Sequence, residues 1–313
     1  MDVKWLQDFL TVAELGNFTR AAETLNSSQT ALSRRIQSLE AWLGARLIDR
    51  SVFPTRLTPE GEQFRHSAAE ILRQVIDARS DLSGAPARDH VRVALPYTLA
   101  TSGLPRWWED WSRDRNLSCS VVVGNVHDMM TALVAGSVDL LVCYNTSQQP
   151  IQLDAAYYNR SALCTESLRP YASPKLLGGR PSLLPGRPDD PVPLLMYSPG
   201  VYFGRLVKFI LQTMPVRIHA RLVVESDMVD VLREMAAAGY GVAWLPDGTI
   251  AADAGSSLVP LGDEALSLTL TTTAFCNRSN DRPAVVRLWE RLTSMAEADL
   301  RDLERRNAGA HPR

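Results

Sequence analysis

The stretch FTRAAETLNSSQTALSRRIQSLEAWL, residues 18–43, indicates two short helices separated by a tight polar turn. The first helix is expected from Arg20 to Leu25, because this segment is alanine-rich and the Thr19 hydroxyl can accept a hydrogen bond from its first turn. The polar residues 26–28 then end it. Two helices joined this closely have the size of a unit that enters the DNA major groove. DNA binding is therefore the leading hypothesis for this part of the chain.

The second helix is expected from Gln29 to Leu43, with Ser27 or Ser28 as its N-cap and Gly44 as its left-handed end. Its apolar residues form one stripe, which contains Leu32, Ile36, Leu39 and Leu43. The opposite face carries the polar side chains of Gln29, Thr30, Ser33, Arg34 and Gln37. Such amide, hydroxyl and guanidinium groups read base edges in the major groove. The alternative is an ordinary solvated face, since exposed helix faces are polar in most proteins.

A dense set of motif positions extends from Leu6 to Phe64. It comprises Phe9, Ala13, Phe18, Ala21, Ala22, Leu25, Ser28, Gln29, Ser33, Ile36, Leu39, Glu40, Leu43, Gly44, Leu47, Arg50, Leu57, Thr58 and Gly61. With this pattern the chain resembles the N-terminal domain of LysR-type transcriptional regulators. The resemblance implies a winged helix-turn-helix DNA-binding domain over residues 1–58. The chain departs from the family at Thr30, usually a proline, at Ile48, usually a phenylalanine, and at Phe53, often a second wing arginine.

Ten polar residues of this domain are the candidate DNA contacts: Thr19, Arg20, Ser28, Gln29, Thr30, Ser33, Arg34, Gln37, Arg50 and Arg56. Arg50 and Arg56 bound a short expected two-stranded wing, whose cations typically hold phosphates and position the protein. The whole chain has a net charge of -2, but residues 1–58 hold seven Lys or Arg against six Asp or Glu. The local charge therefore does not oppose an anionic partner.

Thr58 followed by Pro59 is a strong helix start, and residues 59–83 are predicted to form one long linker helix. Its apolar residues repeat at heptad spacing, at Phe64, Ala68, Ile71, Val75, Ala78 and Leu82. A helix this long is expected to bury that seam against a second copy of the chain. The alternative is that the seam packs on its own chain. The resemblance implies an antiparallel pair of linker helices and a homotetramer completed through the second domain.

At 313 residues the chain has room for two domains, and the second is predicted over residues 91–300. Seven strand-like runs, VRVAL, LSCSVVVG, VDLLVCY, LLMY, RLVVE, GVAWLP and LSLTLTTTAFC, alternate with helical segments. This order favours an α/β fold with largely parallel sheets. The resemblance implies a two-lobed, effector-binding regulatory domain like type 2 periplasmic-binding proteins. Lobe I is expected at about 91–161 and 265–300, and lobe II at about 162–264. The fold class is thus α plus α/β.

Ligands of such lobes bind beyond the carboxyl ends of strands, where helix amino ends favour anionic or polar groups. The candidate effector contacts are Tyr97, Thr98, Thr101, Asn125, His127, Asn145, Ser198, Tyr202 and Met228. Thr98, Asn125, Ser198 and Tyr202 lead this set. Each can instead be an ordinary helix cap, because Ser, Thr and Asn are preferred there in any protein. A small polar or anionic effector is therefore expected between the lobes.

Four segments bring the resemblance closer to the hypochlorite-responsive LysR-type regulators: LLMYSPGVYFGRL, CTESLRPYAS, GYGVAWLP and RPAVVRLWERL. That subgroup senses oxidant through methionine oxidation. Met228 aligns with a methionine of the subgroup, whereas Phe203 stands where the subgroup has another. Oxidant sensing through methionine or cysteine is thus the alternative to small-molecule binding. Methionine on a helix is more often a filler of the core.

Other classes of function have little support in the sequence. No phosphate-binding loop, dinucleotide fingerprint, H-E-x-x-H or G-x-S-x-G motif is present, so neither an enzyme nor a cofactor is expected. Four widely spaced cysteines, at 119, 143, 164 and 276, predict reduced thiols and no metal. Neither a secretory signal nor an apolar run of about 20 residues is found, so a cytoplasmic protein without a membrane partner is expected. The expected partners are double-stranded DNA, a small-molecule effector, further copies of the chain and, as a candidate, RNA polymerase.

Overall fold

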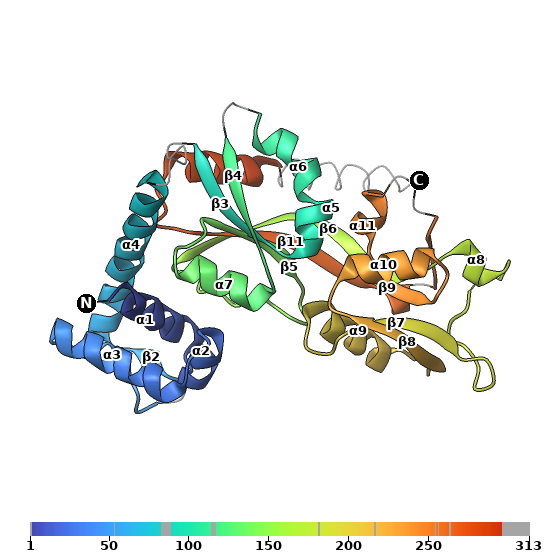
Figure 1. Ribbon diagram of the computed structural model, residues 1–313, viewed down its shortest axis with the longest axis horizontal. Coiled ribbons are helices and arrows are strands. Elements are labelled where there is room, and N and C mark those ends of the chain that lie inside the picture. The colour runs from blue at the N-terminus through green and yellow to red at the C-terminus, as the bar shows by residue number, and fades with distance from the viewer. Residues whose placement is uncertain are drawn as a thin grey trace, which may run out of the picture.

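The computed structural model describes residues 2–295, apart from residues 53, 83–88, 114–116, 181, 216, 254, 256 and 263. Residues 77 and 79–82 are described by their backbone alone. Figure 1 shows a small helical head at the N-terminus, one long helix leaving it, and a large twisted sheet flanked by helices. Phe53, one of the three departures from the family pattern, lies outside the described residues.

Three helices form the head: α1 (Val3–Leu15), α2 (Phe18–Thr24) and α3 (Gln29–Leu43). The predicted bounds of α3 are confirmed, with Ser28 as its N-cap and Gly44 as its left-handed end at a φ of 71°. The predicted cap of α2 is wrong. Asn17 caps this helix, because its side-chain oxygen accepts from the amides of both Thr19 and Arg20, at 2.9 and 3.1 Å. Thr19 lies inside the first turn instead.

The core of the head joins α1 to α3. Leu6, Phe9 and Leu10 of α1 and Leu32, Ile36 and Leu39 of α3 are all buried. The buried carboxylate of Asp8 pairs with the guanidinium of Arg35, which also donates to Ser27 Oγ at 3.2 Å. A buried charge requires such a partner. This ion pair fixes the turn before α3 relative to α1.

A short wing and a long helix complete the N-terminal part. Strands β1 (Ile48–Asp49) and β2 (Arg56–Leu57) pair in antiparallel fashion. The helix α4 (Pro59–Leu82) begins at Thr58, whose hydroxyl accepts from Gly61 N at 3.0 Å and donates to Arg46 O at 2.6 Å. The start of α4 is therefore tied to the segment that leads into the wing.

One face of α4 packs on its own chain. Arg65, Ala68 and Leu72 are buried, and Phe64 contacts Phe9 of α1 with ring centroids 5.4 Å apart. At about 100° per residue, this face lies roughly 80° around the helix from the predicted heptad seam. The alternative, in which the seam packs on its own chain, therefore holds for Phe64, Ala68 and Ile71, which belong to the buried cluster of the head or pack against it.

The outer part of the predicted seam is uncovered in a single chain. Val75 is 43% exposed, Ala78 is exposed, and Ile71 is half-buried. The side chain of Leu82 lies outside the described residues. An apolar face of α4 thus remains available to a second copy.

The described residues of the second domain form one nine-stranded sheet in the order β4-β3-β5-β11-β6-β9-β7-β8, with β10 paired to β6. Its strands are β3 (His90–Leu95), β4 (Ser118–Val123), β5 (Leu140–Asn145), β6 (Tyr158–Ala172), β7 (Val192–Tyr197), β8 (Ala220–Ser226), β9 (Val242–Pro246), β10 (Val259–Pro260) and β11 (Leu268–Asn277). The β3-β4-β5 set and the β7-β8-β9 set are each parallel. Parallel pairing was predicted for both.

The antiparallel pair β6 and β11 joins the two parallel sets (Figure 1). The sequence did not predict β6, because its first half, from Tyr158 to Thr165, is polar and lacks the apolar run of a buried strand. Beyond that half, β6 pairs with β9. One strand therefore passes from the first parallel set to the second.

Helices cover the sheet and line the gap between the two parallel sets. They are α5 (Tyr97–Ser102), α6 (Leu104–Trp111), α7 (Val126–Val134), α8 (Pro174–Leu177), α9 (Tyr202–Thr213), α10 (Val229–Ala237), α11 (Asp247–Ala251), a 3₁₀ turn (Glu264–Leu266) and a helix over 283–295. Trp244 is fully buried and donates through Nε1 to Leu266 O at 2.8 Å. Within the part of the chain described, no helix is long and apolar enough to cross a membrane.

Asp139 anchors the start of β5 and generates the first prediction. Its carboxylate is 1% exposed and accepts from Arg92 Nη2 at 2.9 Å and from Arg282 Nη1 at 2.8 Å. Burial alone would raise the pKa of Asp139, but the hydrogen bonds and charges of the two arginines outweigh it and lower the pKa. Asp139→Ala should therefore lower the free energy of unfolding by about 3 kcal/mol.

The ion pairs of Asp139 with Arg92 and Arg282 also predict that the stability of the fold depends on pH. Because the folded pKa of Asp139 is lowered, its contribution is complete above the unfolded pKa of about 3.9 and is lost as the pH falls below it. Urea titrations should show this acid loss in the native chain and a smaller one in Asp139→Ala. Asp190→Ala is the control, because Asp190 is exposed and pairs with Arg180 at 3.4 Å on the surface. Equal effects of the two substitutions would contradict the prediction.

Candidate functional site

The outward face of α3 is polar from Gln29 to Ser38, whereas the last turn exposes Ala41 and Trp42. Gln29, Thr30, Arg34 and Gln37 are exposed and Ser33 is half-buried, opposite the buried stripe of the same helix. Ser28 is the N-cap and accepts from Ala31 N at 3.2 Å. Thr19 and Arg20 are exposed at the start of α2, and Arg56 is exposed on β2. The candidate residues of the head thus lie at its surface.

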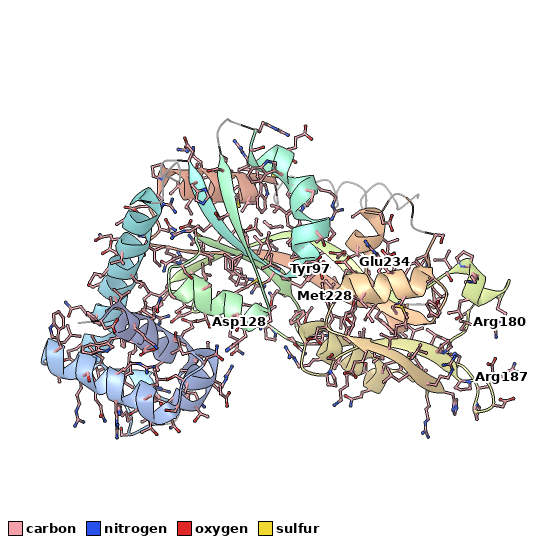
Figure 2. All side chains as sticks on the ribbon, in the orientation of Figure 1. Tyr97, Asp128, Arg180, Arg187, Met228 and Glu234 are labelled. Atoms are coloured by element: carbon pink, nitrogen blue, oxygen red, sulfur yellow. The ribbon has the colours of Figure 1, made fainter. Side chains whose placement is uncertain are left out.

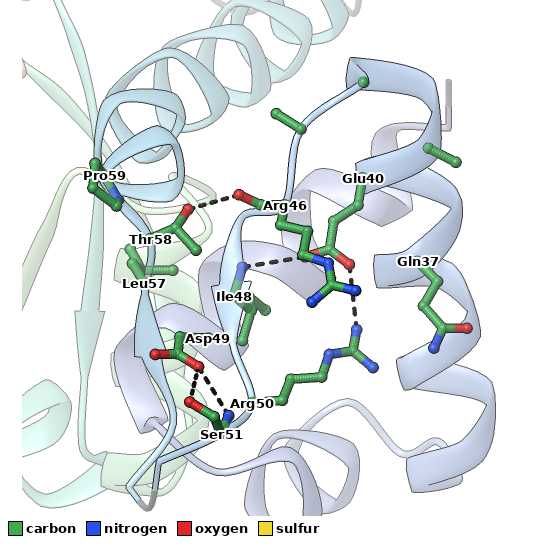
Figure 3. A pocket seen from close by; sticks show the side chains of 13 residues that line it. Gln37, Glu40, Arg46, Ile48, Asp49, Arg50, Ser51, Leu57, Thr58 and Pro59 are labelled. Carbon is green, nitrogen blue, oxygen red and sulfur yellow. Dashed lines mark hydrogen bonds and ion pairs between the residues drawn. The ribbon is translucent and has the colours of Figure 1, made fainter.

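A groove of about 750 Å³ lies between α3, the wing and the start of α4 (Figure 3). It is lined by Gln37, Glu40, Ala41, Gly44, Ala45, Arg46, Ile48, Asp49, Arg50, Ser51, Leu57, Thr58 and Pro59. Glu40 holds this groove in shape. Its Oε1 accepts from the amides of Leu47 and Ile48, at 2.9 and 3.1 Å, and its Oε2 lies 3.4 Å from Arg50 Nη2. The wing is therefore fixed to α3 by one carboxylate.

Arg50 links the wing to the recognition face. It donates through Nη1 to Ser33 Oγ at 3.0 Å, and its guanidinium lies 5.0 Å from the centre of the Phe18 ring. Arg46 also lines the groove and is exposed. Arg46 was not among the predicted DNA contacts, although a cation three residues after the end of α3 was a usable signal. Arg46 and Arg50 therefore present two positive charges at one groove.

A second cavity of about 530 Å³ lies where several helices of the second domain begin. Its lining comprises Pro96, Tyr97, Thr98, Gly124, Asn125, Val126, His127, Tyr144, Gly200, Val201, Tyr202, Phe203, Arg205, Asp227, Met228 and Val229. We call it the cleft. In Figure 2, Tyr97 and Met228 lie near one another in the middle of the molecule, with Asp128 close by at the start of α7. The cleft therefore brings together the starts of α5, α7, α9 and α10.

Side chains cap some helices of the chain and leave others uncapped. The helices α5, α6 and α11 begin without a side-chain cap. Side chains of Asp2, Asn17, Ser28, Asn125 and Ser173 cap α1, α2, α3, α7 and α8. The N-cap residues of α9 and α10 are Val201 and Met228, and neither side chain forms a cap. Among the described residues, no acceptor is found for the amides of Tyr202 and Val229. The cleft thus receives two helix amino ends with free donors.

Thr98 adds a hydroxyl to these donors. It is 5% exposed and lines the cleft, and the described part of the chain offers no hydrogen-bond partner for its Oγ1. The neighbouring Ser102 hydroxyl, in contrast, donates to Thr98 O at 2.7 Å. Among the described residues, Thr98 Oγ1 is not one of the fully buried side-chain atoms that lack a partner, so this oxygen is accessible from the cleft. Thr98 therefore offers a hydroxyl to a polar group in the cleft.

Aromatic rings form the floor of the cleft. Phe203 packs against Tyr144 and Tyr197, each with centroids 5.4 Å away, and against Tyr202 at 5.9 Å. Burial raises the pKa of Tyr202 to about 12 and that of Tyr144 well above its usual value, so both phenols are neutral near pH 7. At the rim, Arg205 Nε donates to Gln149 Oε1 at 3.0 Å. This contact bridges the helix α9 to the loop after β5.

The predicted effector contacts divide into two groups. Tyr97, Thr98, Asn125, His127, Tyr202 and Met228 line the cleft, whereas Thr101, Asn145 and Ser198 do not. The assignment of Asn145 is corrected, because its Oδ1 accepts from Ile151 N at 2.8 Å and fixes the following loop. Thr101 donates to backbone oxygens of α5. Ser198 belongs to the turn before α9, where its carbonyl accepts from Val201 N at 3.2 Å.

The lining residues that were not predicted as contacts include Tyr144, Phe203, Arg205 and Asp227. Arg205 had a signal, since it follows Tyr202 by three residues and so faces the same side of α9. Tyr144 lies inside a strand and had none. Within the described residues, no group of three or more His, Cys, Asp or Glu side chains could hold a metal ion.

Comparisons with known proteins agree with this architecture. The family described as bacterial regulatory helix-turn-helix protein, lysR family, matches residues 3–62, and the LysR substrate binding domain matches residues 84–297. The HTH-type transcriptional regulator YjiE of Escherichia coli K12 is 27% identical over 298 residues, which cover 94% of this chain and 95% of that protein.

Two solved structures are similar over almost the whole chain. Vibrio fischeri DarR in complex with DNA is 30% identical, with a TM-score of 0.58, and covers 94% of this chain and 99% of its own. Full-length HypT from Salmonella typhimurium, described as a hypochlorite-specific LysR-type transcriptional regulator, is 26% identical with a TM-score of 0.57. That match covers 95% of this chain and 99% of the HypT chain.

Proposed function

The chain belongs to the LysR family of bacterial transcriptional regulators, and we propose that it reads a specific DNA sequence through α3 and responds to a small anionic or polar effector held in the cleft. The observation that carries the effector proposal is that the Thr98 hydroxyl and the uncapped starts of α9 and α10 lie at one cleft. The DNA-binding role itself follows from the family. The residue roles and the ligand class are the parts that need testing.

The DNA contacts are proposed in two classes. Gln29, Thr30, Arg34 and Gln37 reach base edges, because they are exposed on the face of α3 that is free of packing. Arg46, Arg50 and Arg56 hold phosphates, since they flank the groove and the wing. Ser33 acts indirectly, because Arg50 donates to its hydroxyl. Ser28 stabilises the start of α3 as its cap.

Arg34→Ala should weaken binding to the specific site by about 1 to 3 kcal/mol and relax preference at one base pair. Fluorescence anisotropy with the selected site and with randomised DNA measures both effects. Arg46→Ala is the control, since loss of a phosphate contact should weaken both DNAs alike and reduce the salt dependence. If Arg34→Ala weakens both DNAs to the same extent, Arg34 is a phosphate contact and its base-reading role is wrong.

The uncovered face of α4 supports dimerisation through this helix. Val75 and Ala78 are exposed there in a single chain, next to the face that packs on α1. Two such faces would bury each other in an antiparallel pair, and further pairing of second domains would give a tetramer. This assembly places two heads on one operator.

Val75→Asp should therefore give a folded protein with fewer copies per assembly and weaker operator binding, because dimerisation would bury a carboxylate in an apolar contact. Sedimentation velocity measures the assembly. Gln63→Asp adds the same charge at an exposed position away from the seam and should leave the assembly unchanged. An unchanged assembly in Val75→Asp would place the dimer contact elsewhere.

The effector proposal depends on donors that face a negative or polar group. Free amides at helix starts and the positive end of the helix dipole favour anions. Arg205 adds a positive charge at the rim, and Asp227 adds a negative one. The aromatic floor suits the apolar body of a small organic acid. A compact carboxylate or oxyanion head with an apolar body therefore matches the cleft best.

Thr98→Val keeps the shape of the side chain but removes its hydroxyl, so it should weaken binding of such a ligand at least about fivefold, as for one lost hydrogen bond. A panel of small organic acids and inorganic oxyanions, screened by thermal shift and measured by calorimetry, provides the ligand. Thr101→Val is the control, because Thr101 lies outside the cleft lining. Equal affinity in Thr98→Val would contradict the proposed contact.

The same assay separates ligand binding from oxidant sensing. Met228 lines the cleft and is 40% exposed, so hypochlorite can reach its sulfur. If no panel member binds, and if the DNA response instead follows hypochlorite dose and disappears in Met228→Leu, the cleft is an oxidant sensor. Binding of an acid that Met228→Leu leaves intact supports the effector proposal.

A further inference from the structure

The helix α7 lies between the cleft and the head (Figure 1). Its amino end contributes Asn125, Val126 and His127 to the cleft lining. Its body contacts α1 and α2, and Met129 and Leu133 share one buried cluster with the core of the head. One helix of nine residues is thus in contact with both functional parts of the chain.

His127 makes this connection at a single side chain. It lines the cleft, and its Nε2 is hydrogen-bonded to Thr24 Oγ1. The Thr24 hydroxyl also lies 2.9 Å from Arg20 O, and the imidazole tautomer sets which of Thr24 and His127 is the donor in their bond. Thr24 is the last residue of α2, and only the turn 25–28 separates it from the first residue of α3. A cleft residue therefore bonds the helix that precedes the recognition helix.

Contacts on the other side of the head keep it docked on the second domain. The guanidinium of Arg65 lies 3.9 Å from the centre of the Tyr157 ring and pairs with Glu14 of α1 at 2.5 Å. The Tyr157 hydroxyl donates to Glu62 of α4, and Arg73 of α4 pairs with Asp281 at 2.9 Å. These contacts hold α1 and α4 in place against the second domain. A shift of α7 would therefore move α2 relative to α1 and α4.

We propose that α7 transmits the state of the cleft to the DNA head of the same chain, and that His127 is the positioning residue that couples the cleft to α2. The inference rests on the proposed effector function of the cleft. It adds a route within one subunit, whereas a change in the spacing of paired heads requires two. A ligand that draws the starts of α5, α9 and α10 toward α7 displaces His127, and with it Thr24 and the start of α3.

The coupling must be reciprocal, since two sites linked by one equilibrium affect each other equally. DNA bound to the head should therefore change the local stability of α7, even without an effector. This consequence can be measured with a non-specific DNA duplex at low salt, which every DNA-binding head of this kind accepts. Hydrogen exchange of the full chain reports residues 125–134 and α2 separately.

The experiment uses the Val75→Asp chain, so that contacts between paired heads do not contribute, and repeats the measurement in the native assembly. DNA should slow exchange in α2 and α3 and also, by about fivefold or more, in residues 125–134. Thr24→Val removes a hydroxyl that lies outside the cleft lining. In this variant DNA should no longer slow exchange in residues 125–134 to the same extent, but should still slow exchange in α3. Thr24→Ser keeps the hydroxyl and should restore the effect.

The proposal is overturned if residues 125–134 respond equally in Thr24→Val, or if DNA leaves them unchanged in every chain. His127→Ala provides an independent second variant and should behave as Thr24→Val does. A parallel arm adds inorganic sulfate to the DNA-free protein as a probe of the cleft. If sulfate protects nothing but the DNA response of 125–134 is present, the anionic ligand class is wrong and the coupling through α7 stands.

Discussion

The pairing of β6 with β11 is the contact on which the second domain depends. The two strands pair along their length in antiparallel fashion; β11 also pairs with β5 of the first parallel set, and β6 also pairs with β9 of the second. Without this pair, the sets β3-β4-β5 and β7-β8-β9 would be separate lobes with no fixed relation. With it, the carboxyl ends of both sets face each other, and the helices that follow these strands begin at one place. The position of the cleft therefore follows from the strand topology, and its side chains then determine its chemistry.

The pattern of helix caps then gives the cleft its chemistry. A helix amino end normally receives a side-chain acceptor, and most helices of this chain follow that rule. The start of α11 begins after a proline without a cap, but the carboxylate of Glu166 on β6 accepts from its Gly248 amide. Burial raises the pKa of Glu166, while the hydrogen bonds from Gly248 and Tyr144 oppose that rise. The start of α11 thus receives an acceptor from β6, whereas α9 and α10 begin uncapped at the cleft.

Features that depend on residues close together in the sequence could be predicted, whereas features that depend on distant partners could not. The bounds of α3 depend on Ser28, Gly44 and a stripe of leucines within the helix, so they could be predicted exclusively from local pattern. The cap of α2 was assigned two residues too late, because both Asn17 and Thr19 are good caps and only the backbone geometry chooses between them. β6 was missed since its burial comes from neighbouring strands, which the polar sequence from Tyr158 onward does not reveal.

The cleft shows the same limit at the level of single residues. Tyr97, Thr98, Asn125 and Tyr202 follow strand ends directly, and the rule that ligands bind there was sufficient to name them. Asn145 follows a strand end equally well, yet its side chain turns back to the amide of Ile151. Tyr144, one residue earlier, faces the cavity instead, because successive side chains of a strand point to opposite faces. Register in the sheet decides between the two, and register is set by partners far away in the sequence.

The helix α7 provides a direct packing contact between the cleft and the head of the same chain. A regulator whose head and cleft were joined only by α4 could change DNA binding only by moving whole subunits relative to one another. Here the core of the head continues into α7, β5 and Phe275 of β11 as one buried cluster. Close-packed interiors transmit small displacements, because side chains that interdigitate cannot move independently. The helix α7 therefore lines the cleft at its amino end and packs in the same buried cluster as the core of the head.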